Sequence, residues 1–179
     1  MPLRHPDAPA PGTQIPSHYA FCFGCGVDHS TGLHLQVTAG EGLTLTAQFT
    51  VTEHHQGAPG LAHGGLLSAA FDESMGALNW LIHVPAVTGR LEIDFRRPVP
   101  VDRTLSITAK VTGRSGRKVF ATAEGRLDSP DGPLAVTAAA TFIAVGLEHF
   151  RSHGRPEDVA KAVANAKTRA VAREFEVNP

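Results

Sequence analysis

The sequence predicts an α+β fold in which one antiparallel sheet packs against a single long helix. Segments with alternating apolar and polar residues are separated by short turns rich in Gly, Asp and Ser, as in strands joined by hairpins. One segment, residues 64–82, instead has apolar residues at helical spacing. The chain has 179 residues, 42% hydrophobic and 18% charged, which suits one compact domain with tails.

The chain divides into three parts. Residues 1–18 are rich in proline and lack periodicity, so we expect a flexible segment rather than a secretory signal. Residues 19–146 form the predicted domain, and residues 147–179 a C-terminal helical tail. The tail has Pro156 and two acidic residues where a helix would begin. Apolar residues then follow at helical spacing: Val159, Val163, Ala166, Ala170 and Val171.

The strands of the domain are predicted from alternation with a period of two. Residues 33–37 and 43–51 are expected to form a hairpin around the turn at residues 39–42. Further strands are expected at residues 91–95, 104–111, 119–127 and 134–145. Long strands joined by hairpins imply one antiparallel sheet.

The predicted helix has two different faces. An apolar stripe for the sheet consists of Leu67, Ala70, Phe71, Met75, Leu78 and Ile82. Another face carries Asp72 among small or polar residues: Gly65, Ser68, Gly76 and Asn79. These small residues either let a ligand approach the carboxylate closely or merely permit tight helix packing. The acid among them favours a site.

The start of this helix, His63-Gly64-Gly65, follows a glycine-rich loop at residues 56–60. Amides in the first turn of a helix lack intrahelical partners and lie at the positive end of the helix dipole, which suits an oxyanion forming on a carbonyl. Gly64 and Gly65 are therefore candidate oxyanion donors. His63 either orients a carbonyl group or is an ordinary N-cap.

These residues carry a family resemblance. Gln56-Gly57, His63-Gly64-Gly65, Asp72, Thr88 and Phe95-Arg96-Arg97-Pro98 resemble the motifs of hotdog-fold acyl-CoA thioesterases, most closely the phenylacetate-pathway and carboxyl-terminal modulator protein types. The resemblance covers about residues 21–145. It implies a hotdog fold, in which an antiparallel sheet wraps a long central helix. It also implies a homo-oligomer, a dimer or a dimer of dimers, whose paired subunits build the active sites.

The resemblance further implies hydrolysis of acyl-CoA, or a related acyl thioester, without a cofactor. Asp72 would be the general base or the nucleophile, and these routes stay open. The amide of Gly64 would hold the thioester oxygen, and Thr88 would place water or the carboxylate. The remaining candidates are His63 and Gln56 for the carbonyl end, Gly65 and Ser68 for substrate, and Arg96, Arg97, Arg117 and Lys118 for the phosphates of coenzyme A.

Helical geometry adds a condition to this site. Gly64 and Asp72 are eight residues apart, about 12 Å along a helix axis, which is too far for both to contact one carbonyl group. If both act, Gly64 of one subunit must face Asp72 of another. The neighbouring acid, Glu73, points about 100° away from Asp72, so Asp72 is favoured as the catalytic carboxylate.

Other functions are weighed against this one. A non-catalytic acyl-CoA sensor or scaffold on the same fold is the main alternative, because a fold does not fix a function. A serine mechanism through Ser68 or Ser74 lacks a nucleophile-elbow motif and a partner histidine. A hydratase would need a different acid–base pair, which the sequence does not offer.

Charge and cysteine content complete the expectations. The net charge of −1 gives no reason to expect nucleic acid or anionic membrane as a partner, and a cytoplasmic protein is expected. Cys22 and Cys25, with His29 and His34, allow a zinc hypothesis. The spacing supports it poorly, because the second ligand pair of a zinc ribbon or finger lies much farther along the chain. The expectation is therefore a packing turn without a metal.

Overall fold

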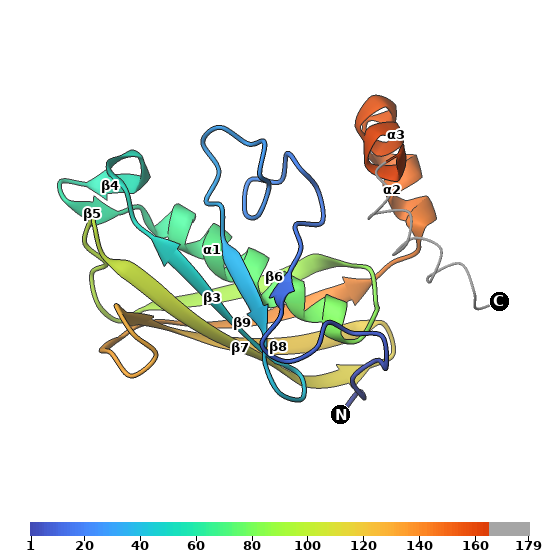
Figure 1. The fold of residues 1–179 in the computed structure, drawn as a ribbon, viewed down its shortest axis with the longest axis horizontal. Coiled ribbons are helices and arrows are strands. Elements are labelled where there is room, and N and C mark those ends of the chain that lie inside the picture. Colours follow the sequence, from blue (N-terminus) through green and yellow to red (C-terminus); the bar gives the residue numbers. More distant parts are fainter. Residues whose placement is uncertain (165–179) are drawn as a thin grey trace.

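The computed structural model describes residues 1–164, in which a curved antiparallel sheet of seven strands wraps around one central helix, α1 (Gly64–Gly76) (Figure 1). The order across the sheet is β1-β2-β3-β7-β8-β9-β6. The strands are β1 (Gln14–Ile15), β2 (Gln36–Ala39), β3 (Thr44–Thr50), β6 (Ala86–Phe95), β7 (Thr104–Ser115), β8 (Lys118–Leu127) and β9 (Leu134–Ala144). This is the hotdog fold that the sequence predicts.

The predicted strands are present, with shifted ends at β2, β6 and β7. β7 runs past residue 111 to Ser115 because it pairs with β8 as far as Lys118. β2 begins at Gln36 because Leu33 and Leu35 are tied elsewhere: their amides donate to the carbonyls of Phe23 and Gly24. β6 begins earlier than alternation suggested because it pairs with β9 along its whole length, through a bulge between Thr88 and Arg90.

The central helix buries its predicted stripe against the concave face of the sheet. All six stripe residues, from Leu67 to Ile82, are buried. β8 passes so close to the helix that a Cβ at Gly125 would lie 2.7 Å from Cζ of Phe71, so this strand position requires glycine. Burial of this stripe fixes which side of α1 faces away from the core.

The helix ends earlier than the sequence predicts. After Gly76 the chain tightens into a 3₁₀ helix, η2 (Ala77–Leu81). The Asn79 side chain donates to the carbonyl of Gly76, and the Asn79 carbonyl accepts from the amides of Ile82 and Val84. These local bonds compete with the α-helical pattern and end it.

The segment before α1 differs from the expected open loop. A short 3₁₀ helix, η1 (Glu53–His55), leads into a small hairpin of β4 (Gln56–Ala58) and β5 (Leu61–Ala62), which turns at Gly60 with a φ of 72°. The glycine is favoured there because that backbone conformation disfavours other residues. This hairpin lies at the N-terminal end of α1 (Figure 1).

Both terminal segments contact the domain. β1 pairs with β2 and buries Ile15, and the His5 amide donates to the Leu81 carbonyl. The C-terminal tail forms α2 (Leu147–His153) and α3 (Pro156–Ala164), at the end of the molecule opposite the β4–β5 hairpin (Figure 1). The expected helical positions Ala166, Ala170 and Val171 lie outside the described residues.

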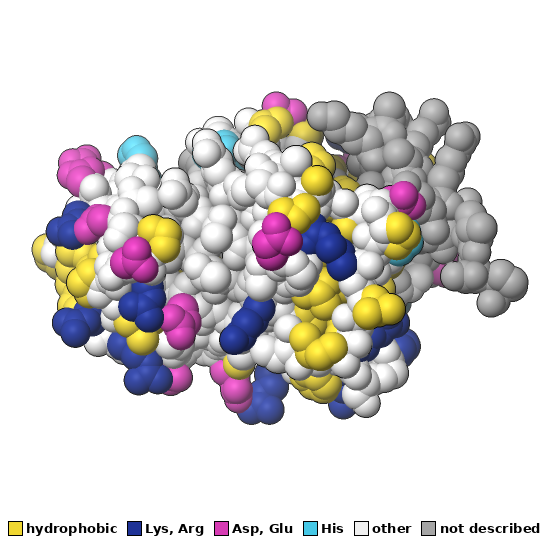
Figure 2. All heavy atoms as spheres, turned by 60° about the horizontal axis from the view of Figure 1, so that its bottom comes forward, with side chains coloured by type: hydrophobic (Ala, Val, Ile, Leu, Met, Phe, Trp, Pro, Cys, Tyr) yellow, Lys and Arg dark blue, Asp and Glu magenta, His cyan; other side chains and the backbone are white. Residues whose placement is uncertain are grey.

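Charged side chains of both signs are interspersed on the surface. On the face in Figure 2, Lys and Arg alternate with Asp and Glu rather than gathering in one patch. Within residues 1–164, no helix combines the length and hydropathy needed to cross a membrane.

Candidate active site

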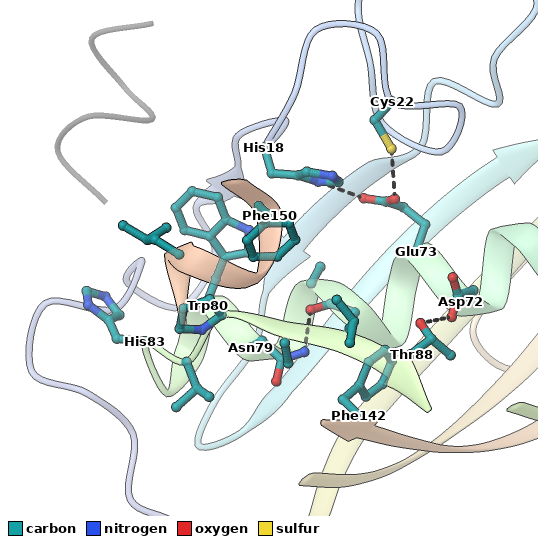
Figure 3. A pocket seen from close by; sticks show the side chains of 17 residues that line it. His18, Cys22, Asp72, Glu73, Asn79, Trp80, His83, Thr88, Phe142 and Phe150 are labelled. Carbon is teal, nitrogen blue, oxygen red and sulfur yellow. Dashed lines mark hydrogen bonds and ion pairs between the residues drawn. The ribbon is translucent and has the colours of Figure 1, made fainter. Parts of the chain in front are cut away.

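A cavity of about 540 Å³ opens beside the C-terminal half of α1 (Figure 3). Its walls come from α1, η2, the start of β6, β9 and α2. One end is apolar and is lined by Trp80, Leu147 and Phe150, while Phe142 lies between the two ends beside its strand partner Thr88 (Figure 3). The other end is polar and is lined by Asp72, Thr88, His18, Cys22 and Glu73. An apolar slot that ends at a carboxylate suits a ligand with a hydrophobic chain and a polar reacting group.

Asp72 is held at the polar end by Thr88. The Thr88 hydroxyl, on β6, donates a 2.7 Å hydrogen bond to Oδ1 of Asp72, on α1. Burial raises the pKa of the Asp72 carboxyl, an effect that the Thr88 hydrogen bond opposes and the nearby Glu73 charge reinforces. Thr88 thus fixes one carboxylate oxygen and favours the ionised form.

The two neighbouring acids of α1 face different partners (Figure 3). Asp72 faces Thr88, whereas Glu73 contacts the His18 ring at 3.5 Å and accepts a 3.2 Å hydrogen bond from the Cys22 thiol. The helical separation expected from the sequence therefore gives these carboxylates distinct environments.

The N-terminal end of α1 lies away from this cavity. Of the predicted residues there, His63, Gly64, Gly65, Ser68 and Gln56, none lines it. His63 is the N-cap: its Nδ1 accepts a 2.9 Å hydrogen bond from the Gly65 amide. That bond occupies the Gly65 amide. Within residues 1–164, the Gly64 amide has no hydrogen-bond partner and is left as the candidate oxyanion donor.

Gln56 and Ser68 have local partners. The Gln56 side chain donates to the Glu53 carbonyl at 3.1 Å and accepts from the Gly60 amide at 2.7 Å, which braces the β4–β5 hairpin. The Ser68 hydroxyl donates to the Gly64 carbonyl at 2.9 Å. Both side chains therefore have structural roles within one chain.

The predicted cationic residues fall at two opposite ends of the sheet. Arg96 and Arg97 follow β6 at its Gly64 end, and Arg96 contacts Thr137 at 3.3 Å and Asp94 at 3.7 Å. Arg117 and Lys118 lie at the β7–β8 turn. Lys118 pairs with Ile143, which in turn pairs with Val87, so this turn lies at the Thr88 end.

β6 is an edge strand of ten residues with an open side. Phe95, at its end, is 53% exposed and lies against Gly64, where a Cβ would approach its ring to 3.2 Å. A long exposed edge of this kind is a natural place for strand pairing with another chain.

Several lining residues escape sequence reasoning. The sequence marks Trp80 only as a packing or subunit-contact residue, and it gives Leu147 and Phe150 no role. The sequence gives no functional signal for Leu147 and Phe150, because they belong to the C-terminal tail outside the recognisable motif. Only the packing of α2 beside η2 brings them to the cavity.

The two cysteines lie in a cluster that the sequence does not indicate. His18 and Glu73, rather than His29 and His34, accompany them. Hydrogen bonding to Cys22 and Glu73 raises the pKa of His18 to about 10. The contact between the two cysteines lowers the pKa of the Cys22 thiol and raises the pKa of the Cys25 thiol. Because their candidate ligand atoms all lie within 4.8 Å of one another, His18, Cys22, Cys25 and Glu73 are the described residues best placed to hold a metal.

Comparisons with known proteins agree with the fold and the motif. A family model described as the thioesterase superfamily matches residues 59–133. The chain is 33% identical over 88 residues to the acyl-coenzyme A thioesterase THEM4 of Xenopus laevis, a match that covers 49% of this chain and 39% of that protein. The chain thus spans only about two fifths, or less, of the curated relatives that it matches.

Solved structures share the fold. A phenylacetic acid degradation-related protein from Ralstonia eutropha JMP134 is 26% identical, with a TM-score of 0.55 over 63% of this chain and 86% of that one. A hypothetical thioesterase protein from Streptococcus pneumoniae TIGR4, solved with coenzyme A, is 18% identical, with a TM-score of 0.54 over 57% of this chain and 82% of that one. Together with the wrapped helix and the His-Gly-Gly and Asp motif, these matches show that the fold is the hotdog fold and that residues 59–133 are similar to the thioesterase superfamily.

Proposed function

We propose that this protein is an acyl-CoA thioesterase, which hydrolyses acyl-CoA or a related acyl thioester to a free acid and a thiol. The observation that carries the proposal is the Asp72 carboxylate, fixed by Thr88 at the polar end of an apolar cavity. A protein that only binds acyl-CoA has no need of a carboxylate at the reacting end.

Thioester hydrolysis needs few catalytic groups, because a thiolate is a good leaving group. Thr88 occupies Oδ1 of Asp72, which leaves Oδ2 to take a proton from water or to attack the carbonyl carbon. The first route is general-base catalysis, and the second passes through a mixed anhydride. Both require the same carboxylate in its ionised form.

The oxyanion donor in this proposal is the Gly64 amide of a second subunit. Within one chain, Gly64 and Asp72 lie about 12 Å apart along the helix axis. A homodimer, alone or as half of a dimer of dimers, completes the site when Gly64 of the partner subunit faces Asp72. The open ten-residue edge of β6 and the exposed Phe95 beside Gly64 support this assembly.

The acyl chain is assigned to the apolar end of the cavity, along Trp80, Leu147 and Phe150. Arg117 and Lys118, at the Thr88 end of the sheet, are proposed to receive the phosphates of coenzyme A bound at Asp72. Arg96 and Arg97 lie at the Gly64 end. In a dimer they would therefore contact the phosphates of coenzyme A bound at Asp72 of the partner subunit.

The neighbour from Streptococcus pneumoniae adds support. It was solved with coenzyme A and also as two variants, one with an aspartate and one with a threonine replaced by alanine. Those two positions are as far apart in its sequence as Asp72 and Thr88 are here.

The direct test is thiol release from a panel of thioesters: short, long and aromatic acyl-CoAs, together with acyl carrier protein thioesters. The proposal expects turnover of at least one acyl-CoA by the wild type and loss of it in Asp72→Asn. Asp131→Asn, in an exposed turn, is the matched control and should keep wild-type turnover. Tight binding of acyl-CoA without turnover of any member would support a sensor instead.

A further inference from the structure

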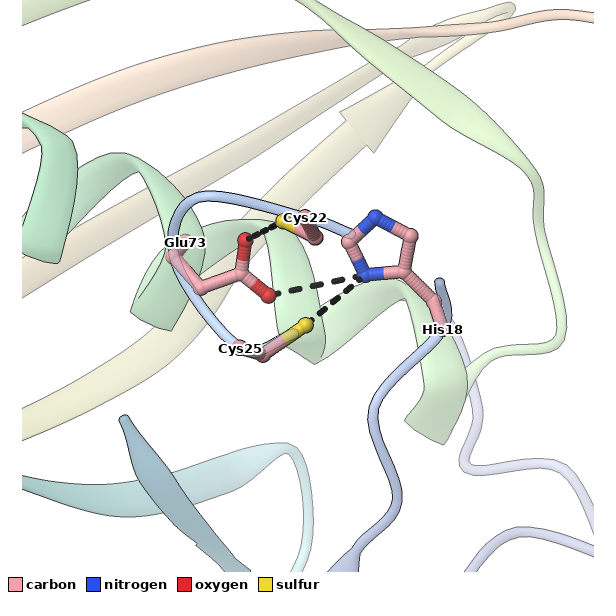
Figure 4. Close-up of side chains that lie close together, drawn as sticks. All are labelled: His18, Cys22, Cys25 and Glu73. Atoms are coloured by element: carbon pink, nitrogen blue, oxygen red, sulfur yellow. Dashed lines mark hydrogen bonds and ion pairs between the residues drawn. The ribbon is translucent and has the colours of Figure 1, made fainter. Parts of the chain in front are cut away.

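We propose that His18, Cys22, Cys25 and Glu73 form a structural Zn²⁺ site that fastens the loop at residues 18–26 to helix α1. Three of the four ligands come from one short loop, and the fourth comes from the helix that carries Asp72 (Figure 4). The four candidate ligand atoms all lie within 4.8 Å of one another.

The separations between these atoms fit a tetrahedral zinc ion. Zinc bonds of about 2.0–2.3 Å place neighbouring ligand atoms roughly 3.3–3.8 Å apart. Here Cys22 Sγ lies 3.2 Å from Glu73 Oε2, Cys25 Sγ lies 3.3 Å from His18 Nδ1, and His18 Nδ1 lies 3.5 Å from Glu73 Oε1. The remaining pairs lie within 4.8 Å, so side-chain rotation can bring one atom of each residue to bonding distance from an ion.

The backbone of the loop is shaped for this convergence. The Gly26 amide donates to the Cys22 carbonyl at 2.8 Å, which folds the segment between the cysteines into a tight turn. A Cβ at Gly26 would lie 2.4–2.5 Å from backbone atoms of Ala20 and Cys22, so the turn requires glycine. The Leu33 and Leu35 amides bond to the carbonyls of Phe23 and Gly24, which anchors the turn beside β2.

Gly24 provides the space for the fourth ligand. A Cβ at this position would lie 2.5 Å from both Cγ and Oε2 of Glu73. The carboxylate thus reaches the two thiols only because the loop has no side chain there. Two thiols, an imidazole and a carboxylate brought together from separate segments are a donor set that zinc prefers, and a tetrahedral set of sulfur with harder ligands is typical of it.

The other histidines of this region do not compete for the ion. The His29 ring packs edge-on against Phe23, with ring centroids 5.4 Å apart, and His34 lies outside the cluster. The four protein ligands fill the tetrahedron and leave no position for a catalytic water, so the site is structural. It still borders the cavity, because His18, Cys22 and Glu73 line its polar end.

The first test is the metal content of the full-length chain, purified under reducing conditions without a chelator and measured by plasma mass spectrometry. We expect close to one zinc per chain in the wild type. Cys22→Ser and Cys25→Ser should each lose most of it. His34→Asn is the matched control and should keep it, since asparagine tolerates the φ of 49° at that position.

A second variant changes the geometry and keeps every ligand. Gly24→Ala places a methyl group where the Glu73 side chain lies, so the Kd for zinc should rise about 10-fold or more. Co²⁺ reconstitution supplies a spectroscopic readout. Tetrahedral d–d bands and a thiolate-to-cobalt charge-transfer band should appear in the wild type, weaken in Gly24→Ala and stay unchanged when coenzyme A is added.

Chelation of the wild type covers the case in which the cysteine variants fail to fold. Removal of the ion should lower Tm, and added zinc should restore it. Several results would overturn the proposal: no zinc retained when it is supplied to the reduced protein, zinc retained in a Cys22→Ser/Cys25→Ser chain, or a Cys22–Cys25 disulfide in a protein that takes up no zinc after reduction. A cobalt spectrum that changes with coenzyme A would overturn the structural role.

Discussion

The Thr88 hydroxyl, on an edge strand of the sheet, donates a 2.7 Å hydrogen bond to Oδ1 of Asp72, on the central helix. The bond therefore joins two of the elements that line the cavity. It orients the carboxylate of Asp72, which lines the cavity, by holding one of its two oxygens. The proposed chemistry depends on this arrangement.

Replacing the carboxylate should stop turnover. Asp72→Asn keeps the shape of the side chain but removes the base or nucleophile, so kcat should fall about 100-fold or more. Thiol release from the best acyl-CoA substrate measures the loss, and the Tm of the variant should stay near that of the wild type.

Glu73→Gln is the comparison for this experiment. Glu73 contacts His18 and Cys22 instead of Thr88. Its replacement should therefore lower the zinc content and Tm but have little effect on kcat. If Asp72→Asn stays active while a folded Glu73→Gln is inactive, then Glu73, not Asp72, is the catalytic acid.

Thr88 should act as a positioning residue. Thr88→Val keeps the β-branched shape and removes the donor, so kcat should fall about 10-fold or more, corresponding to the roughly 1.5–3 kcal/mol of a hydrogen bond to a charged group. Thr88→Ser restores the hydroxyl and should recover most of the activity. Equal losses in the valine and serine variants would mean that the methyl group, not the hydrogen bond, matters at this position.

Mixed subunits should reveal whether the site is shared. Gly64→Pro removes the amide donor at a helix start that tolerates proline, after a His63 backbone that is already extended. Gly64→Ala adds a Cβ but keeps the amide, so it is the control for crowding against Phe95. Each inactive parent, Gly64→Pro and Asp72→Asn, lacks one half of both sites.

Co-refolding the two parents in equal amounts should restore about a quarter of wild-type activity, since about half the dimers are mixed and each of these has one intact site. Native mass spectrometry measures the fraction of mixed dimers. If a sample that contains mixed dimers is no more active than the parents, Gly64 and Asp72 of different subunits do not form one active site.

The α2 wall should set acyl preference. Phe150→Ala removes apolar surface from the cavity, so kcat/KM for the longest accepted acyl-CoA should fall roughly 10-fold relative to acetyl-CoA, the scale of 1–3 kcal/mol of lost apolar contact. Ser152→Ala, on the same helix but outside the cavity, should not change this ratio. The same loss for every chain length would mean that Phe150 supports the fold rather than the acyl group.

Much of the fold follows from local sequence patterns. Alternation with a period of two predicted the strands, and the stripe from Leu67 to Ile82 predicted which side of the helix is buried. These signals are readable because burial imposes a fixed period on each element. The predicted end of α1 was wrong. The Asn79 side chain and carbonyl form local hydrogen bonds that cannot be inferred from the spacing of apolar residues.

The sequence by itself determined the main strands, the buried stripe of the central helix and the motif that carries Asp72 and Thr88. Only the tertiary structure decided that Glu73 meets Cys22, 51 positions away, and that Phe150 of the tail closes the cavity beside Trp80. The physical reason is that periodicity encodes which face of an element is buried, whereas contacts between distant segments depend on how whole elements pack. The pairing of a loop thiol with a helix carboxylate leaves no local pattern, so it becomes visible only when the chain is folded.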